Sequence, residues 1–430
     1  MKRLLLPVAL FLAPVLSAQT DIFILCEGNF QTPNATVWSF SDNLNDLAGP
    51  LYWDPNSNPL GDTGQSMTVN GQDLYIVMNN SHTIEKVDLS NGFTPVASLS
   101  IPGAGPRYIV VAGTKAFIST WNLSGLLVVD LNTFTISDTL IIPNAKTEQM
   151  VIRGSMLWVT SPMHGDWSTN NQVYKIQIDT SPTLVDSFTV VPGPTGILAQ
   201  DSTLYITSTY YDANWNAMSG TATIDISTGD VVTHDYGSAL GYDDLTLIDG
   251  QVYRGVPGGL APIQADLSVD MGNGYFISGN VYAAASREDY VYLATSNYTA
   301  PDTVTVLNTA GAILAQFAVG ALPGSFAFYN PATVSIASEP ALPSAISLGP
   351  AYPNPFNPQV RMDIKMNEPG LLNITVVNVI GETVEQLFSG PLAAGIHQVN
   401  WKPQHAASGT YFIRVQNENT VLQRRITLLK

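Results

Sequence analysis

The chain has 430 residues, of which 12% are charged and 45% are hydrophobic, and its net charge is −17 at pH 7. This length exceeds one typical domain, and the hydrophobic content excludes a disordered chain. The acidic balance argues against a nucleic-acid partner. The single cysteine, Cys26, excludes an internal disulfide and a cysteine-based metal site.

The first 18 residues have the pattern of a secretory signal peptide. Lys2 and Arg3 precede an apolar run from Leu4 to Leu16, which small residues follow. This run is short for a membrane span and contains two prolines. We therefore expect residues 1–18 to be removed, and the mature chain to be exported without a transmembrane segment.

Residues 19–330 contain a weak repeat, whose core is a short strand with an aromatic residue at a fixed place. Seven copies occur 39 to 52 residues apart, with aromatic residues Phe23, Tyr75, Phe117, Trp158, Tyr205, Tyr253 and Tyr292. Four strand-like segments per unit, split by Gly, Asn and Pro, are typical of a propeller blade. We predict an all-β chain in which these residues form a seven-bladed β-propeller.

The two ends of the repeat are complementary. The segment "GSFAFYN" (324–330) has the pattern of a first strand without a successor, and "DIFILC" (21–26) that of a second strand without a predecessor. If both lie in one blade, the chain closes the ring with its own ends and leaves no open edge there.

One face of this propeller is predicted to bind a ligand. In an antiparallel blade, loops between second and third strands share a face with the connections from blade to blade. On that face "YYDANWNAMSG" (210–220) places three rings within six residues. Trp and Tyr combine stiff apolar contact with a hydrogen-bonding group. The candidate residues are Trp53, Arg107, Trp121, Glu148, His164, Trp167, Tyr210, Tyr211, Trp215, Asp243 and Tyr298. The alternative is that each ring packs only on its own loop or on the neighbouring blade.

No catalytic motif is recognisable in the sequence, so no catalytic residue and no required cofactor are predicted. Asp212, Asn214 and Asn216 are spaced like the start of a calcium loop, which leaves calcium open as a ligand. Asp243 and Asp244 are consecutive, and consecutive strand residues point to opposite sides, which argues against paired acid–base work. The alternatives to a binding protein are a propeller enzyme, such as a lyase or a calcium-dependent hydrolase, and an adhesive or structural surface protein.

The rest of the chain is predicted to be a linker and a small second domain. Residues 331–347 are rich in Pro, Ala and Ser and poor in charge, as linkers are. In residues 348–430, alternation such as that of Leu372, Ile374 and Val376 predicts short half-buried strands. About 80 residues of such strands favour a small immunoglobulin-like β-sandwich.

Two resemblances add to this interpretation. The strings "FILCEGNF" (23–30), "PLGDTGQSM" (59–67), "MNNSHTIEKVD" (78–88), "GPRYI" (105–109) and "TEQM" (147–150) resemble YncE-like, YVTN-type bacterial surface propellers. Some members of that family capture cobalamin, so the resemblance implies a binding propeller with a small-molecule, glycan or protein ligand, cobalamin included.

The tail resembles the C-terminal sorting domain of the type IX (Por) secretion system. The matching strings are "YPNPFNP", "NVIGETV", "AAGIHQVNW", "SGTYFIRV" and "RRITLLK", and the first of them comprises Tyr352, Pro353, Asn354, Pro355, Phe356, Asn357 and Pro358. The resemblance implies the type IX machinery as a partner, and a secreted or cell-surface location outside the outer membrane of a Gram-negative bacterium.

Overall fold

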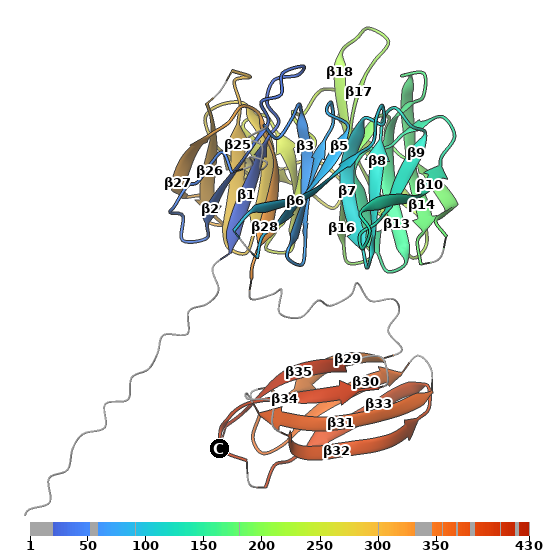
Figure 1. Cartoon of the computed structure of the whole chain (residues 1–430), viewed down its shortest axis with the longest axis vertical. Coiled ribbons are helices and arrows are strands. Elements are labelled where there is room, and N and C mark those ends of the chain that lie inside the picture. The colour runs from blue at the N-terminus through green and yellow to red at the C-terminus, as the bar shows by residue number, and fades with distance from the viewer. Residues whose placement is uncertain are drawn as a thin grey trace, which may run out of the picture. The chain divides into compact units, whose positions relative to one another are not determined.

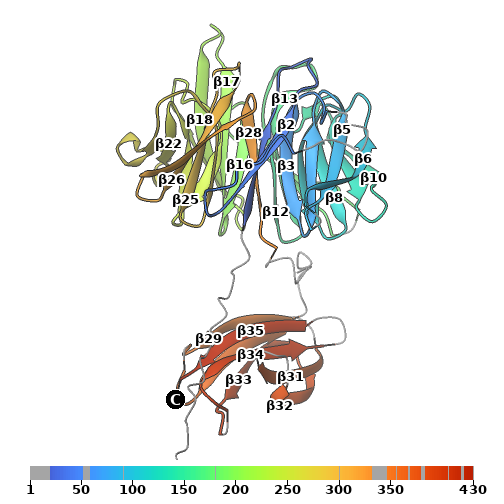
Figure 2. The same cartoon turned by 60° about the vertical axis from the view of Figure 1, so that its left-hand side comes forward.

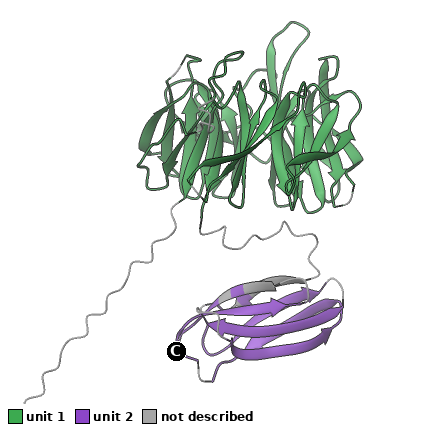
Figure 3. Cartoon of the chain, in the orientation of Figure 1, with its two compact units in different colours: residues 1–340 green, residues 341–430 purple. Residues whose placement is uncertain are grey.

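The computed structural model describes residues 20–51, 59–90, 92–179, 181–299, 301–331, 346–354, 356–366, 369–378, 383–404, 406–417 and 421–429. The chain divides into two compact units, residues 1–340 and 341–430 (Figure 3). The predicted signal peptide, Trp53 and most of the predicted linker lie outside the described residues. Within the described ranges, no helix has the length and apolarity needed to cross a membrane.

The first unit contains seven antiparallel sheets, which are the blades of the propeller (Figures 1 and 2). Blade 1 contains β28 (Pro323–Tyr329), β1 (Asp21–Cys26) and β2 (Thr36–Ser41). Blade 2 contains β3 (Gly64–Asn70), β4 (Asp73–Met78), β5 (Thr83–Asp88) and β6 (Thr94–Ser100). Blade 3 contains β7 (Pro106–Ala112), β8 (Lys115–Thr120), β9 (Gly125–Asp130) and β10 (Thr135–Ile141). Blade 4 contains β11 (Ala145–Lys146), β12 (Met150–Arg153), β13 (Met156–His164), β14 (Thr169–Gln177) and β15 (Thr183–Thr189).

The remaining three blades continue this order. Blade 5 contains β16 (Pro194–Gln200), β17 (Thr203–Tyr211), β18 (Ala217–Asp225) and β19 (Val231–Asp235). Blade 6 contains β20 (Leu245–Ile248), β21 (Gln251–Val256), β22 (Gly259–Pro262) and β23 (Tyr275–Phe276), with a 3-10 turn η1 (Met271–Asn273) before the last strand. Blade 7 contains β24 (Val281–Arg287), β25 (Tyr290–Thr295), β26 (Asp302–Asn308) and β27 (Ile313–Val319).

The innermost strands form a closed ring. In order around the ring, β28, β3, β7, β12, β16, β20 and β24 each contact the next, and β24 contacts β28 again. The core lies between neighbouring blades, where for example Tyr75 and Val77 of blade 2 pack with Ile109 and Ile118 of blade 3. The repeated aromatic residue therefore marks a position that faces the neighbouring blade, which explains its recurrence along the chain.

Blade 1 joins the two ends of the propeller, as the sequence predicts. β1 pairs antiparallel with β28, in a register that runs from Asp21 opposite Tyr329 to Leu25 opposite Ser325. On the outer side, Ser39 and Ala48 exchange two backbone hydrogen bonds of 2.8 Å, which adds a short fourth segment to the blade. The pairing of β1 with β28 satisfies backbone groups that an open ring would expose.

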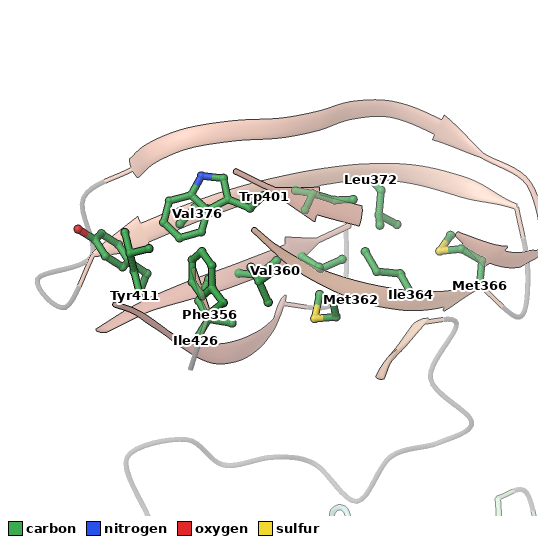
Figure 4. Close-up of a cluster of buried hydrophobic side chains, with 14 residues drawn as sticks. Phe356, Val360, Met362, Ile364, Met366, Leu372, Val376, Trp401, Tyr411 and Ile426 are labelled. Atoms are coloured by element: carbon green, nitrogen blue, oxygen red, sulfur yellow. The ribbon is translucent and has the colours of Figure 1, made fainter. Parts of the chain in front are cut away.

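The second unit is a sandwich of two antiparallel sheets. One sheet has the order β29 (Ile346–Tyr352), β30 (Val360–Met366), β33 (Gly395–Trp401), and the other β32 (Thr383–Leu392), β31 (Gly370–Asn378), β34 (Gly409–Gln416), β35 (Val421–Leu428). Its core contains Phe356, Trp401 and Tyr411 (Figure 4). β29 begins at Ile346, so it includes the last two residues of the predicted linker, which ends at residue 347.

The "YPNPFNP" string is part of this fold. The Phe356 amide donates to the Thr427 carbonyl at 2.9 Å, and the Thr427 amide donates to Asn354 Oδ1 at 2.8 Å. The Phe356 ring is buried 5.5 Å from the Trp401 ring. The string therefore attaches the start of the sandwich to its last strand, although Pro355 itself lies outside the described residues.

Candidate ligand-binding site

Two long hairpins form a wall on one face of the propeller. The strands β13 and β14 of blade 4, and β17 and β18 of blade 5, have 9 residues each. The corresponding strands of blade 2, β4 and β5, have 6 residues each. The β17–β18 hairpin projects beyond the neighbouring loops (Figure 1). The longer strands carry the turns of these two hairpins further from the centre of their sheets than six-residue strands would.

The same turn ends both hairpins and places one tryptophan at each tip. The Trp167 amide donates to the His164 carbonyl at 3.0 Å, and the Trp215 amide donates to the Asp212 carbonyl at 3.0 Å. Both tryptophans adopt left-handed backbone conformations, with φ of 70° and 63°. This conformation costs an ordinary residue about 1–2 kcal/mol, and Gly311 occupies the equivalent place in the β26–β27 turn.

The tryptophans at these tips are not used to fill a core. Leu267 has the same left-handed backbone in another turn, but its side chain is only 3% exposed. Trp167 and Trp215 are instead 56% and 83% exposed. A bulky residue in this conformation without burial to compensate is strained, and Tyr298 in blade 7 shares the combination, with φ of 68° and 57% exposure.

Beside this wall lies a cavity of about 640 Å³. Eight of the eleven predicted residues line it: Arg107, Trp121, Glu148, Trp167, Tyr210, Tyr211, Trp215 and Asp243. Pro162, Met163, Ser168, Thr169, Thr195, Thr209, Asp212 and Ala213 complete the lining. The cavity therefore joins residues from blades 3, 4 and 5 and from the connection into blade 6, on the face that the sequence predicts.

An ion pair joins blades 3 and 4 at this cavity. Arg107 Nη2 lies 2.6 Å from Glu148 Oε1, and Arg107 Nε donates to both carboxylate oxygens at 3.1 Å. Arg107 Nη1 also donates to Gln65 Oε1. Burial disfavours the charge of Arg107, but the adjacent Glu148 carboxylate outweighs burial and raises the pKa of the guanidinium. The arrangement fixes both side chains in place.

Two tryptophans of the cavity are held by cations. The Arg107 guanidinium lies 3.9 Å from the centre of the Trp121 ring, and Trp121 Nε1 donates to Glu148 Oε2 at 2.5 Å. The Lys146 ammonium lies 3.7 Å from the centre of the Trp167 ring and donates to the Trp121 carbonyl at 2.7 Å. Burial lowers the pKa of Lys146. The two rings meet edge to face, 5.8 Å apart. These contacts set the ring orientations before any ligand arrives.

A second carboxylate, that of Asp243, enters the cavity lining from the connection into blade 6. Its oxygens accept hydrogen bonds from Thr209 Oγ1 at 2.6 Å and from Thr195 Oγ1 at 2.7 Å. Arg254 is fully buried, and its Nη2 lies 3.9 Å from Asp243 Oδ1 with no hydrogen-bond partner among the described residues. The neighbouring Asp244 accepts a hydrogen bond from the Ala284 amide at 2.7 Å instead.

The structure separates the other candidates from this cavity. His164 lies at the start of its turn, with Nδ1 3.2 Å from the Asn144 carbonyl, and does not line the cavity. Tyr298 also stays outside the lining, and its ring lies 6.2 Å from that of Tyr282. Trp53 belongs to the residues that the structure does not describe.

The predicted calcium spacing has a structural explanation in the hairpin turn. Asp212 Oδ1 accepts from the amides of Asn214 and Asn216 at 2.8 Å each, and Oδ2 accepts from the Asn216 side chain at 2.9 Å. The hydrogen bond from the Asn216 side chain is the largest of the contacts that lower the pKa of Asp212. Among the described residues, no group of three or more His, Cys, Asp or Glu side chains could hold a metal ion.

Sequence reasoning missed several residues at this site. Thr195 follows a Gly-Pro pair before an inner strand, just as Arg107 does, and this repeated pair could have identified it. Thr209, Lys146 and Arg254 show no such signal, because isolated threonines and basic residues within strands are ordinary. Their roles follow only from contacts between blades.

The fold and cavity define a β-propeller with an aromatic-lined cavity on one face, and comparisons with known proteins extend this description. Residues 350–428 match the family model of the secretion system C-terminal sorting domain. This match confirms the resemblance of the tail and indicates secretion by the type IX route, to the cell surface or outside the cell. A search of curated proteins found no match.

Solved structures support the propeller fold. The periplasmic gluconolactonase PpgL of Pseudomonas aeruginosa is similar with a TM-score of 0.54 and 14% identity, over 72% of this chain and 99% of that one. A candidate 6-phosphogluconolactonase from Bacteroides fragilis is similar with a TM-score of 0.56 and 12% identity, over 74% of this chain and 100% of that one. At this level of identity, the likeness concerns the fold alone.

Proposed function

We propose that the protein is a secreted binding protein whose propeller holds a ligand in the cavity beside the hairpins of blades 4 and 5. The observation that supports this most is the convergence of five rings, Trp121, Trp167, Tyr210, Tyr211 and Trp215, on one cavity of about 640 Å³. Binding pockets of small molecules have this size and this mixture of aromatic walls with few polar groups.

The ordered lining also favours binding. Because Arg107, Glu148 and the rings of Trp121 and Trp167 are already held by the protein, a ligand would not have to order them. The sorting domain delivers this cavity to the outside of the cell, where a compound could be captured from the surroundings. No cofactor is part of the proposal. The resemblance to YncE-like propellers makes cobalamin the first compound to test.

The test is a titration of the purified chain from residue 19 with cobalamin, calcium, neutral oligosaccharides and peptides, followed by tryptophan fluorescence and calorimetry. The proposal expects saturable binding of one compound at one site, without chemical change of the compound. Binding should weaken in Trp215→Ala and persist in Phe30→Ala, which removes an exposed ring outside the cavity lining.

Three outcomes would change the proposal. Recovery of a chemically altered compound would favour an enzyme. Equal binding by the wild type and Trp215→Ala would move the site elsewhere. Binding of proteins but of no small compound would favour the adhesion alternative.

A further inference from the structure

We infer that the ligand of this cavity is a neutral saccharide, an inference that rests on the proposed binding function. It follows from three properties of the described lining residues. The charged groups already have partners within the protein, the carboxylates retain the capacity to accept hydroxyl groups, and fixed aromatic rings stand beside them.

The first property is charge. Arg107 is paired with Glu148, the oxygens of Asp243 accept from two threonines, and those of Asp212 accept from its own turn. An anionic ligand would lose water without gaining an unpaired cation among these described lining residues, and desolvation of a charge without a partner is costly. The cavity therefore disfavours anionic saccharides and favours neutral ones.

The second property is hydrogen bonding. A carboxylate has about four positions for donors, and the hydroxyls of Thr195 and Thr209 use only some of those on Asp243. The positive charge of Arg254 nearby stabilises the negative charge of Asp243. Hydroxyl donors to a carboxylate form short, strong hydrogen bonds. A purely apolar ligand would instead bury Asp243 without replacing its water, so the ligand must bring hydrogen-bond donors, which the hydroxyl groups of a saccharide supply.

The third property is the arrangement of the rings. A saccharide ring presents C–H groups on its faces and hydroxyls around its rim, and C–H groups suit the negative face of an aromatic ring. Trp121 and Trp167 are held in place by cations, and the Tyr211 and Trp215 rings, 6.3 Å apart, continue the aromatic surface to the hairpin tip. The exposed rings at the tip give a longer saccharide chain further contact outside the cavity.

The experiment measures binding of the purified chain from residue 19 to neutral hexasaccharides of glucose, mannose and xylose. Sulfated and uronic-acid oligosaccharides and cobalamin serve as comparisons. We expect one neutral class to bind. Trp215→Ala should weaken that binding at least about tenfold, as loss of a central aromatic contact does. Asp243→Asn should weaken it about tenfold or more through loss of a charged acceptor. Phe30→Ala should bind as the wild type does.

The outcomes separate the two proposals. Binding of charged saccharides only, or of cobalamin only, with the same dependence on Trp215, would refute the saccharide inference and leave the proposed binding function intact. If none of these compounds, and neither calcium nor the peptides of the first titration, changes the tryptophan fluorescence or melting temperature, both proposals fail. Should Asp243→Asn not fold, Trp215→Ala carries the test, because that side chain is 83% exposed.

Discussion

The backbone at Trp215 provides a test that needs no ligand. Its φ of 63° lies in the left-handed region, and its side chain is 83% exposed. At most exposed positions, alanine gives a more stable protein than glycine by about 0.4–1 kcal/mol, because glycine has more freedom in the unfolded chain. At Trp215 we expect the reverse order.

The magnitude follows from two contributions. A left-handed conformation costs alanine about 1–2 kcal/mol and costs glycine almost nothing. After subtraction of the unfolded-state advantage of alanine, Trp215→Gly should be more stable than Trp215→Ala by about 0.5–1 kcal/mol. Both variants lose the contact of the covered part of the ring, roughly 40 Å² or about 1 kcal/mol, so this contribution cancels in the comparison.

The assay is differential scanning calorimetry of the propeller transition in both variants. The expected difference in the free energy of unfolding corresponds to about 1–3 °C in melting temperature for a domain of this size. Tyr211 supplies the matched control, because it is similarly exposed but lies in the strand β17. There alanine should be more stable than glycine. If alanine is also the more stable replacement at Trp215, the argument from backbone conformation is wrong.

Three further predictions concern the rest of the chain. Burial raises the pKa of Asp244 to about 7. The stabilising contribution of the protonated Asp244 carboxyl should therefore be fully present below about pH 4 and lost as the pH rises towards 7. Asp244→Asn should stabilise the protein at pH 8 by about 1–3 kcal/mol and have little effect at pH 4. Arg107→Met leaves the Glu148 carboxylate, whose side chain is 5% exposed, without its counter-charge, and should cost about 2–4 kcal/mol in urea unfolding; adding Glu148→Gln should recover part of this loss. Phe356→Ala removes a buried ring of the sandwich and should destabilise that domain by about 3–5 kcal/mol, which would appear as reduced export in fractionated cells with unchanged ligand binding by the propeller.

The fold could be predicted because its repeated features are local. An aromatic residue at a fixed place in each second strand, such as Tyr75 or Trp158, packs between blades wherever it occurs. The closing pair of β1 and β28 could be predicted because each end lacked the strand that the other supplied. Both inferences use only the order of the strands along the chain, and this order can be read directly from the sequence.

The site could be predicted in part. Loops that share a face can be listed from strand order, and this placed Arg107, Trp121 and Trp215 together. Strand order does not say how far each hairpin rises, so it could not separate Tyr298, which stands beside Tyr282, from the rings that line the cavity. Lys146, the cation behind Trp167, was missed because its partner lies in a hairpin turn 21 residues further along the chain.

The position of the cavity follows from a departure from the symmetry of the ring. Seven similar blades offer seven equivalent loop positions, and blades with equal hairpins would form an even rim around the axis. Blades 4 and 5 carry longer hairpins, and their turns hold tryptophan where the backbone favours glycine. The longer hairpins and their tryptophans line one side of the cavity, next to Arg107, Glu148 and Asp243 at or just before the start of the inner strands β7, β12 and β20. We therefore expect that deleting two residues from each strand of the β17–β18 hairpin, next to its turn, abolishes binding. The propeller should stay folded, because this hairpin contains none of the inner strands that form the ring.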